Sequence, residues 1–375
     1  MIEKRSHIWQ WFLDNKIEPT NLKAAMLVAY PHPNTENWQQ LIANILLYLG
    51  VLLLSAGMIF FMAFNWDALA HLSKFAIVEG LFALFISGFY LINRMQKKQH
   101  SPQKPLKQQS QNVYGWSLPN AMLLGASIML GALLALVGQT YQTGADPWQL
   151  FAIWAVLILP FAYIAGFDLL WLLLVVLINI SQGLYFQSFA SVFSFLQEDI
   201  QQIAIFGVTN LVIHLAFTIA KCCKWPGQLR FNCPMVEKSS LLASVSVFTW
   251  LIIWVIFDLN YQYEASEHAV YYALLYLLTL TSLFIWYRYR APALYPLALV
   301  LTSISAAIVS LLSRALLESN DSIASFFLIA MVVVGVTSGS LYWLKKWQKQ
   351  FSEMASLEHK DANNSDVKTE VAADE

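Results

Sequence analysis

The feature that most constrains this chain is a series of apolar runs that are each long enough to cross a lipid bilayer. A spanning α-helix needs about 20 predominantly apolar residues. Between the fourth and fifth runs, Pro160 and Gly166 predict a break. The sequence therefore predicts an all-α, polytopic transmembrane bundle of about ten spanning helices within residues 41–344. In chain order the predicted spans are 41–64, 74–93, 119–138, 148–165, 167–186, 203–220, 239–257, 270–287, 292–312 and 323–344.

The amino-acid composition also indicates that these apolar runs lie in a lipid bilayer. The chain has 375 residues, of which 58% are apolar and only 12% are charged. Ordinary soluble domains carry about 25% charged residues. A water-soluble protein of this composition would expose large apolar patches, which favour aggregation. We expect the lipid bilayer to be the main partner of the chain and expect no nucleic-acid partner.

Charged residues alternate between the predicted loops. Basic residues follow the second, sixth, eighth and tenth predicted spans, whereas the intervening loops are mainly acidic. The basic set is Arg94, Lys97, Lys98, Lys104, Lys107, Lys221, Lys224, Arg230, Lys238, Arg288, Arg290, Lys345, Lys346 and Lys349. Because basic loops stay on the cytoplasmic side, this alternation supports an even number of spans. It predicts that the N-terminus and the C-terminus are both cytoplasmic.

Two polar segments flank the predicted membrane domain. Residues 1–40 predict a cytoplasmic amphipathic helical hairpin, since apolar residues recur there with helical spacing and Pro19 favours the start of a second helix. The hairpin is too short to bury a core, so we expect it to dock on the membrane domain or on a partner protein. Residues 345–375 are polar and acidic, and this composition predicts a disordered cytoplasmic tail.

Polar residues at membrane depth are the candidate functional residues, because such side chains are costly in lipid. Glu79 lies about 8 Å inside the second predicted span by helix rise. It is either a proton- or cation-binding carboxylate or an acid that snorkels to the outer interface. Asn210 and His214 share one face of the sixth span and either line a proton path or hydrogen-bond between helices. Asn179, Ser181 and Gln182 lie toward the outer end of the fifth span, where interfacial hydrogen bonding is expected.

Two similar motifs end the first and third predicted spans. The first span ends on Asn65-Trp66-Asp67, and the third on Gly138-Gln139-Thr140-Tyr141, followed by Gly144 and Asp146. Each motif places an amide, then an aromatic residue, then an acid at the outer end of its span. Aromatic residues anchor at headgroup depth, and amides satisfy the last carbonyls of a helix. The repetition suggests a weak parallel repeat.

Small residues mark the same two spans. They are Gly50, Gly57, Gly125, Gly131 and Gly138. Glycine lets neighbouring helices approach closely, so we expect tight packing at these positions.

These motifs carry a resemblance to a known family. The run of small residues into Asn65-Trp66-Asp67, followed by Gly138-Gln139-Thr140-Tyr141 with Gly144 and Asp146, resembles the domain-of-unknown-function 2157 family of predicted bacterial membrane proteins. The N-terminal hairpin also fits that family, and the resemblance covers roughly residues 5–165. It implies a bacterial inner-membrane location and assigns no activity.

The sequence leaves two functional interpretations in competition. It contains no paired-aspartate, HExxH or Ser/His arrangement at membrane depth, so an intramembrane enzyme is disfavoured. Its three cysteines lack the spacing of a metal site, and we expect no metal and no cofactor. A membrane scaffold or assembly factor is slightly favoured. The alternative is a proton- or cation-coupled secondary transporter that uses Glu79 and the Asn210/His214 pair.

Overall fold

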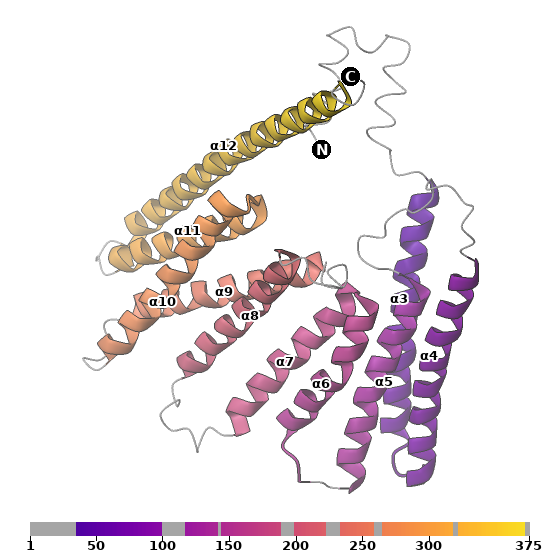
Figure 1. The fold of residues 1–375 in the computed structure, drawn as a ribbon. Coiled ribbons are helices and arrows are strands. Elements are labelled where there is room, and N and C mark those ends of the chain that lie inside the picture. Colours follow the sequence, from indigo (N-terminus) through magenta and orange to yellow (C-terminus); the bar gives the residue numbers. More distant parts are fainter. Residues whose placement is uncertain are drawn as a thin grey trace.

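The fold is a bundle of long α-helices (Figure 1). In the computed structural model, the residues described are 35–99, 117–141, 144–188, 199–222, 233–258, 265–317 and 322–371. Across these ranges the chain forms α-helices and one π-helical turn, η4, and no strand. The elements are α3 (Thr35–Phe64), α4 (His71–Gln99), α5 (Leu118–Tyr141), α6 (Pro147–Ala165), α7 (Asp168–Ser188), α8 (Asp199–Cys222), α9 (Pro234–Asp258), α10 (Ala265–Ile285), η4 (Trp286–Arg290), α11 (Leu294–Leu317) and α12 (Ser322–Val371).

The predicted number of spans is confirmed. Within the described ranges, 10 helices are long and apolar enough to cross a membrane. Their limits follow the hydropathy pattern closely; the fourth predicted span, 148–165, corresponds to α6. The predicted N-terminal hairpin falls mostly outside the described residues. Its last residues, from Thr35 onward, belong to α3 instead.

The break between α6 and α7 lies at Gly166. Gly166 adopts the left-handed conformation, with φ 54° and ψ 39°, and its N–H donates to the carbonyl of Ala162 at 3.0 Å. Glycine adopts this conformation without steric cost, which explains why the helix ends there. Pro160 was also expected to contribute to the break, and that expectation is wrong, because Pro160 lies inside α6.

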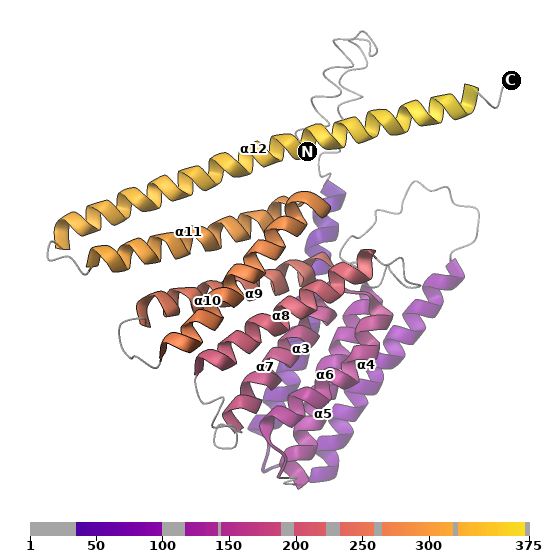
Figure 2. The ribbon, with the colours of Figure 1, turned by 60° about the vertical axis from the view of Figure 1, so that its left-hand side comes forward.

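The last helix is longer than its predicted span. It continues as one helix to Val371, where the sequence predicted a disordered tail from residue 345. Good helix formers such as Lys, Gln, Glu and Met populate the stretch directly after the apolar part. Lys349 and Glu353 also form an i,i+4 ion pair at 3.9 Å. Figure 2 shows α12 running alongside α11 and continuing past it.

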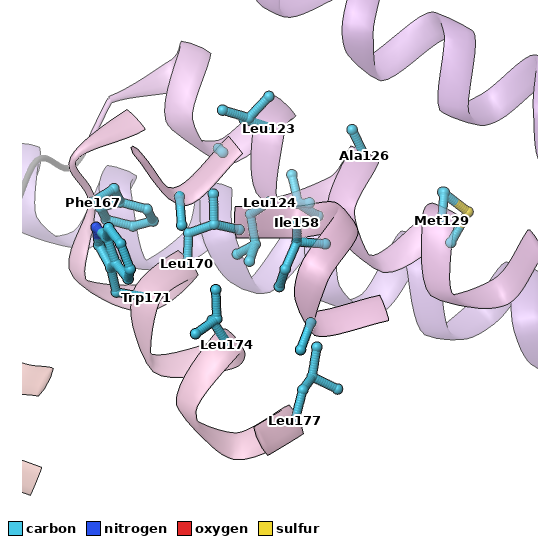
Figure 3. Close-up of a cluster of buried hydrophobic side chains, with 14 of the residues drawn as sticks. Leu123, Leu124, Ala126, Met129, Ile158, Phe167, Leu170, Trp171, Leu174 and Leu177 are labelled. Atoms are coloured by element: carbon cyan, nitrogen blue, oxygen red, sulfur yellow. The ribbon is translucent and has the colours of Figure 1, made fainter. Parts of the chain in front are cut away.

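The buried side chains form two hydrophobic clusters. The first packs α3 to α7 together, with α5 in contact with α3, α4 and α6. Figure 3 shows the part of this cluster that α5, α6 and α7 contribute. The second packs α8 to α12, with α9 in contact with α8, α10 and α11. The two clusters meet where α7 packs on α8 and α9. Polar side chains are concentrated at this junction, which makes it the starting point for the candidate site.

The glycines of α3 and α5 differ in what surrounds them. A Cβ atom on Gly125 would lie 2.7 Å from the ring of Phe85, and one on Gly131 would lie 2.4 Å from the ring of Trp154. Tight packing is therefore confirmed at these two positions. It is wrong for Gly50, Gly57 and Gly138, where an added Cβ would meet nothing within 4 Å.

Candidate functional site

An amide pair joins α7 to α8 inside the bundle. The Nδ2 of Asn210 donates to the Oδ1 of Asn179 at 2.7 Å and to the carbonyl of Phe206 at 2.9 Å. Asn179 in turn donates to the carbonyl of Val175 at 2.8 Å. Asn210 is buried. Polar side chains commonly hydrogen-bond between membrane helices in this way.

His214 shares a helix face with Asn210 but has different partners. It lies one turn further along α8 and is only 1% exposed. Its Nδ1 is 2.9 Å from the carbonyl oxygen of Glu237, and its Nε2 is 2.7 Å from the hydroxyl of Tyr287 in η4. Because a carbonyl oxygen only accepts, Nδ1 carries the proton, and Nε2 of the neutral ring accepts from the tyrosine hydroxyl. The imidazole thus connects α8 to α9 and to η4.

Asp168 caps a neighbouring helix at the same end of the bundle. It is the first residue of α7, and its Oδ1 accepts the N–H of Met235 at 3.2 Å, at the start of α9. The N–H of Val236 and the side chain of Cys233 also lie beside this carboxyl group. A carboxylate at a helix N-terminus satisfies free N–H groups and interacts favourably with the helix dipole.

An ion pair completes this polar cluster, which comprises Asp168, His214, Lys221, Glu237 and Tyr287. Lys221, in the last turn of α8, pairs with Glu237, in the first turn of α9. The sequence pattern did not single out Asp168, Glu237 or Tyr287, and it marked Lys221 only as a basic loop residue. One signal for Asp168 was present, since it is an acid where the loop pattern otherwise places basic residues.

Burial also changes the chemistry of Cys233, which precedes the first residue of α9. Its side chain is completely buried. Burial, together with the neighbouring Asp168 carboxylate, raises the pKa of the Cys233 thiol to about 12. The thiol therefore stays protonated at neutral pH, and a protonated thiol is a poor nucleophile.

Glu79 lies apart from the other candidate residues. Its helix, α4, packs on α5, whereas α8 packs on α7 and α9. Glu79 is exposed on the face of α4 that points away from the bundle. The structure thus does not bring Glu79 together with Asn210 or His214, and the functional roles of all three stay predictions.

The two motifs that end the first and third spans meet at the start of α4. The Nδ2 of Asn65 donates to the carbonyl of Phe61 at 2.9 Å, so this amide satisfies a helix-terminal carbonyl as expected. The ring of Trp66 lies 3.7 Å from the Nζ of Lys74, which is only 2% exposed. The next residue, Phe75, packs on Tyr141 with ring centroids 6.1 Å apart.

The two acids and the Gln139 amide of these motifs lie nearer the surface of this end. Asp67 and Gln139 are exposed, and Asp146 precedes α6 as its N-cap residue without a side-chain capping bond. On α4, Lys74 contacts Trp66 of the first motif, and the next residue, Phe75, contacts Tyr141 of the second. The start of α4 therefore connects the end of α3 to the end of α5.

A cavity of about 390 Å³ lies between α6 and α7. Its α6 side is formed by Trp148, Ala152, Ala155, Val156 and Leu159, and its α7 side by Leu174, Ile178, Ser181, Gln182 and Tyr185. None of Glu79, Asn210 and His214 lines it.

The chain is similar to known proteins over only part of its length. No curated protein and no solved structure matches it. The model of one family, described as predicted membrane protein (DUF2157), matches residues 10–171, a range that includes α3 to α6 and the start of α7. The chain is a membrane protein whose residues 10–171 match the DUF2157 family, and the resemblance drawn from its motifs is confirmed.

Proposed function

We propose that this chain is a scaffold or assembly factor of the bacterial inner membrane that binds a spanning helix of another membrane protein through α4. The observation that carries the proposal is Glu79, a carboxylate at membrane depth on an exposed helix face. An ionised side chain inside a spanning helix is costly in lipid, and the cost reaches about 2.5–3.5 kcal/mol at the helix centre; Glu79, which lies nearer one end of its span, has a smaller cost of the same kind. A hydrogen-bond donor or a cation on a partner helix would offset that cost.

The surroundings of Glu79 support close approach by a helix. Ala76, Gly80, Ala83 and Ser87 are exposed and lie on the same face of α4 as Glu79. A Cβ atom on Gly80 would meet nothing within 4 Å. Small residues at this spacing let two helix backbones approach closely in a membrane. A different protein fits better than a second copy, because two-fold symmetric contact would place two Glu79 carboxylates against each other.

The buried polar residues favour this proposal over transport. Asn210 and His214 are hydrogen-bonded to neighbouring helices, and the cavity between α6 and α7 contains neither. In a coupled transporter we expect such residues to face a substrate path. Proton-driven uptake in proteoliposomes that disappears in Glu79→Gln would instead support the transporter.

A cytoplasmic location of both termini belongs to the same proposal. It is supported by basic residues at one set of helix ends, such as Arg94, Lys221, Arg288 and Lys345. Reporter fusions within 94–118 and 258–269 test it. We expect the first reporter to be active only in its cytoplasmic form and the second only in its periplasmic form. Finding both on one side would refute this topology.

Site-specific photo-crosslinking tests the partner directly. A benzophenone amino acid at Ala83 probes the exposed face of α4, and the same group at Ile153, which is 51% exposed on α6, is the control. We expect one discrete protein adduct at Ala83 and none at Ile153. The adduct should persist in Glu79→Gln, which keeps hydrogen-bonding capacity, and disappear in Glu79→Leu. Mass spectrometry should then find a donor side chain at matching depth in the partner.

Three outcomes would refute the proposal. They are adducts of equal yield at both positions, adducts with the chain itself, and an adduct that is unchanged in Glu79→Leu.

A further inference from the structure

The cavity between α6 and α7 has the shape of a groove that opens sideways. It extends along α6 from Trp148 to Leu159, which is about 16 Å by helix rise. Ala152 and Ala155 leave the space, since their side chains are short. Val156 is 69% exposed and Leu159 is 50% exposed. Because this part of α6 lies within a candidate span, the groove opens toward lipid.

One end of the groove is polar. Trp148 and Tyr185 meet edge to face there, with ring centroids 5.0 Å apart. The hydroxyl of Ser181 donates to the carbonyl of Trp148 at 3.0 Å. Trp and Tyr side chains concentrate where the hydrocarbon core meets the headgroups. The groove therefore runs from headgroup depth into the hydrocarbon core.

Gln182 supplies a hydrogen-bond donor at this polar end. Its Nε2 is shielded from solvent and has no acceptor among the residues that the structure describes. Leaving a buried amide donor without a partner is unfavourable. An acceptor carried by a bound molecule would remove this cost.

We propose that the groove binds one acyl chain of a membrane phospholipid, with Gln182 donating to the ester carbonyl of that chain. The apolar walls match the acyl chain, and the volume lies within the range of about 300–1,000 Å³ that is typical of ligand sites. In a phospholipid, the ester carbonyl lies where the chain joins the headgroup region, and it accepts hydrogen bonds without donating any. The bilayer supplies this ligand through the lateral opening. The site is separate from the exposed face of α4, so either proposal can fail without the other.

Lipid exchange with the unaltered chain is the first test. The full-length protein is purified in mild detergent, stripped of lipid, and offered either a diester phosphatidylglycerol or the matching diether, which lacks both carbonyl groups. Native mass spectrometry then measures the bound fraction. We expect the diester to bind in one-to-one ratio and the diether to bind roughly two- to tenfold more weakly, the range expected for one lost hydrogen bond. Equal binding of the two lipids would overturn the proposal.

Variants locate the site. Ala152→Phe fills the groove, and Gln182→Leu removes the donor with little change of size. Ile153→Phe is the matched control, because Ile153 is the next residue of α6 and lies outside the groove lining. We expect the diester to be lost in Ala152→Phe, weakened in Gln182→Leu and retained in Ile153→Phe. Equal retention in Ala152→Phe and Ile153→Phe would refute this location, and recovery of a quinone in place of a phospholipid would refute the ligand. If Ala152→Phe does not fold, the diester–diether comparison still decides the matter.

Discussion

Replacing Gly131 by alanine tests the packing of α5 on α6. The added Cβ would lie 2.4 Å from two ring atoms of Trp154, whereas ordinary contacts begin near 3.4 Å. The indole therefore has to retreat by roughly 1 Å. Its Nε1 donates to the carbonyl of Ser127 at 2.8 Å, and the retreat would break that bond. Overpacking costs about 1–3 kcal/mol and a lost hydrogen bond about 0.5–1.5 kcal/mol, so we expect destabilisation of about 1.5–4.5 kcal/mol.

Gly138→Ala is the matched control for this prediction. Gly138 lies on the same helix, and a Cβ atom there would meet nothing within 4 Å. Alanine favours the helical conformation over glycine by up to about 1 kcal/mol. We therefore expect Gly138→Ala to be unchanged or slightly more stable than the original chain.

The free energy of unfolding can be measured by titrating the purified protein with SDS in mixed micelles and following tryptophan fluorescence. Gly131→Ala should unfold at a lower SDS fraction than Gly138→Ala. Adding Trp154→Leu to Gly131→Ala should recover part of the loss, since the smaller side chain leaves room for the Cβ. Equal stability of the two alanine variants would show that α5 and α6 are not packed as described.

Three further predictions concern the junction of the two halves. Asp168→Ala should lower the free energy of unfolding by about 0.5–2 kcal/mol because α9 loses its cap, with Asp168→Asn milder; equal losses in the same titration would contradict a capping role. A double-mutant cycle of Asn179→Leu and Asn210→Leu should give a coupling energy of about 0.6 kcal/mol, and no coupling would argue against the amide pair. With Cys233 as the sole cysteine, maleimide at pH 8 should label the folded protein slowly and the SDS-denatured protein fully, since burial raises the pKa of this thiol to about 12. Fast labelling of the folded protein would contradict its burial.

The sequence by itself determined the spans and the features that depend on neighbours along the chain. Each segment that crosses the lipid must meet the same two requirements by itself. Its backbone groups must be hydrogen-bonded within the helix, and it needs about 20 mostly apolar residues to cross the hydrocarbon core. Hydropathy over one window therefore suffices to predict a span. The Asn65 amide was predictable for the same reason, since its acceptor, Phe61, is four residues away.

Only the tertiary structure decided which polar residues act together. Asp168 bonds to a residue 67 positions away, and His214 to one 73 positions away, so no local pattern could pair them. Gly131 and Gly138 look alike in the sequence, yet only Gly131 faces a neighbouring helix. Glu79 shows the same limit, because helical spacing places it on a face of α4 while packing on α5 decides that this face stays exposed. Which face of a helix packs against another helix depends on the shapes of both helices. The sequence of one helix describes the shape of only one of the two.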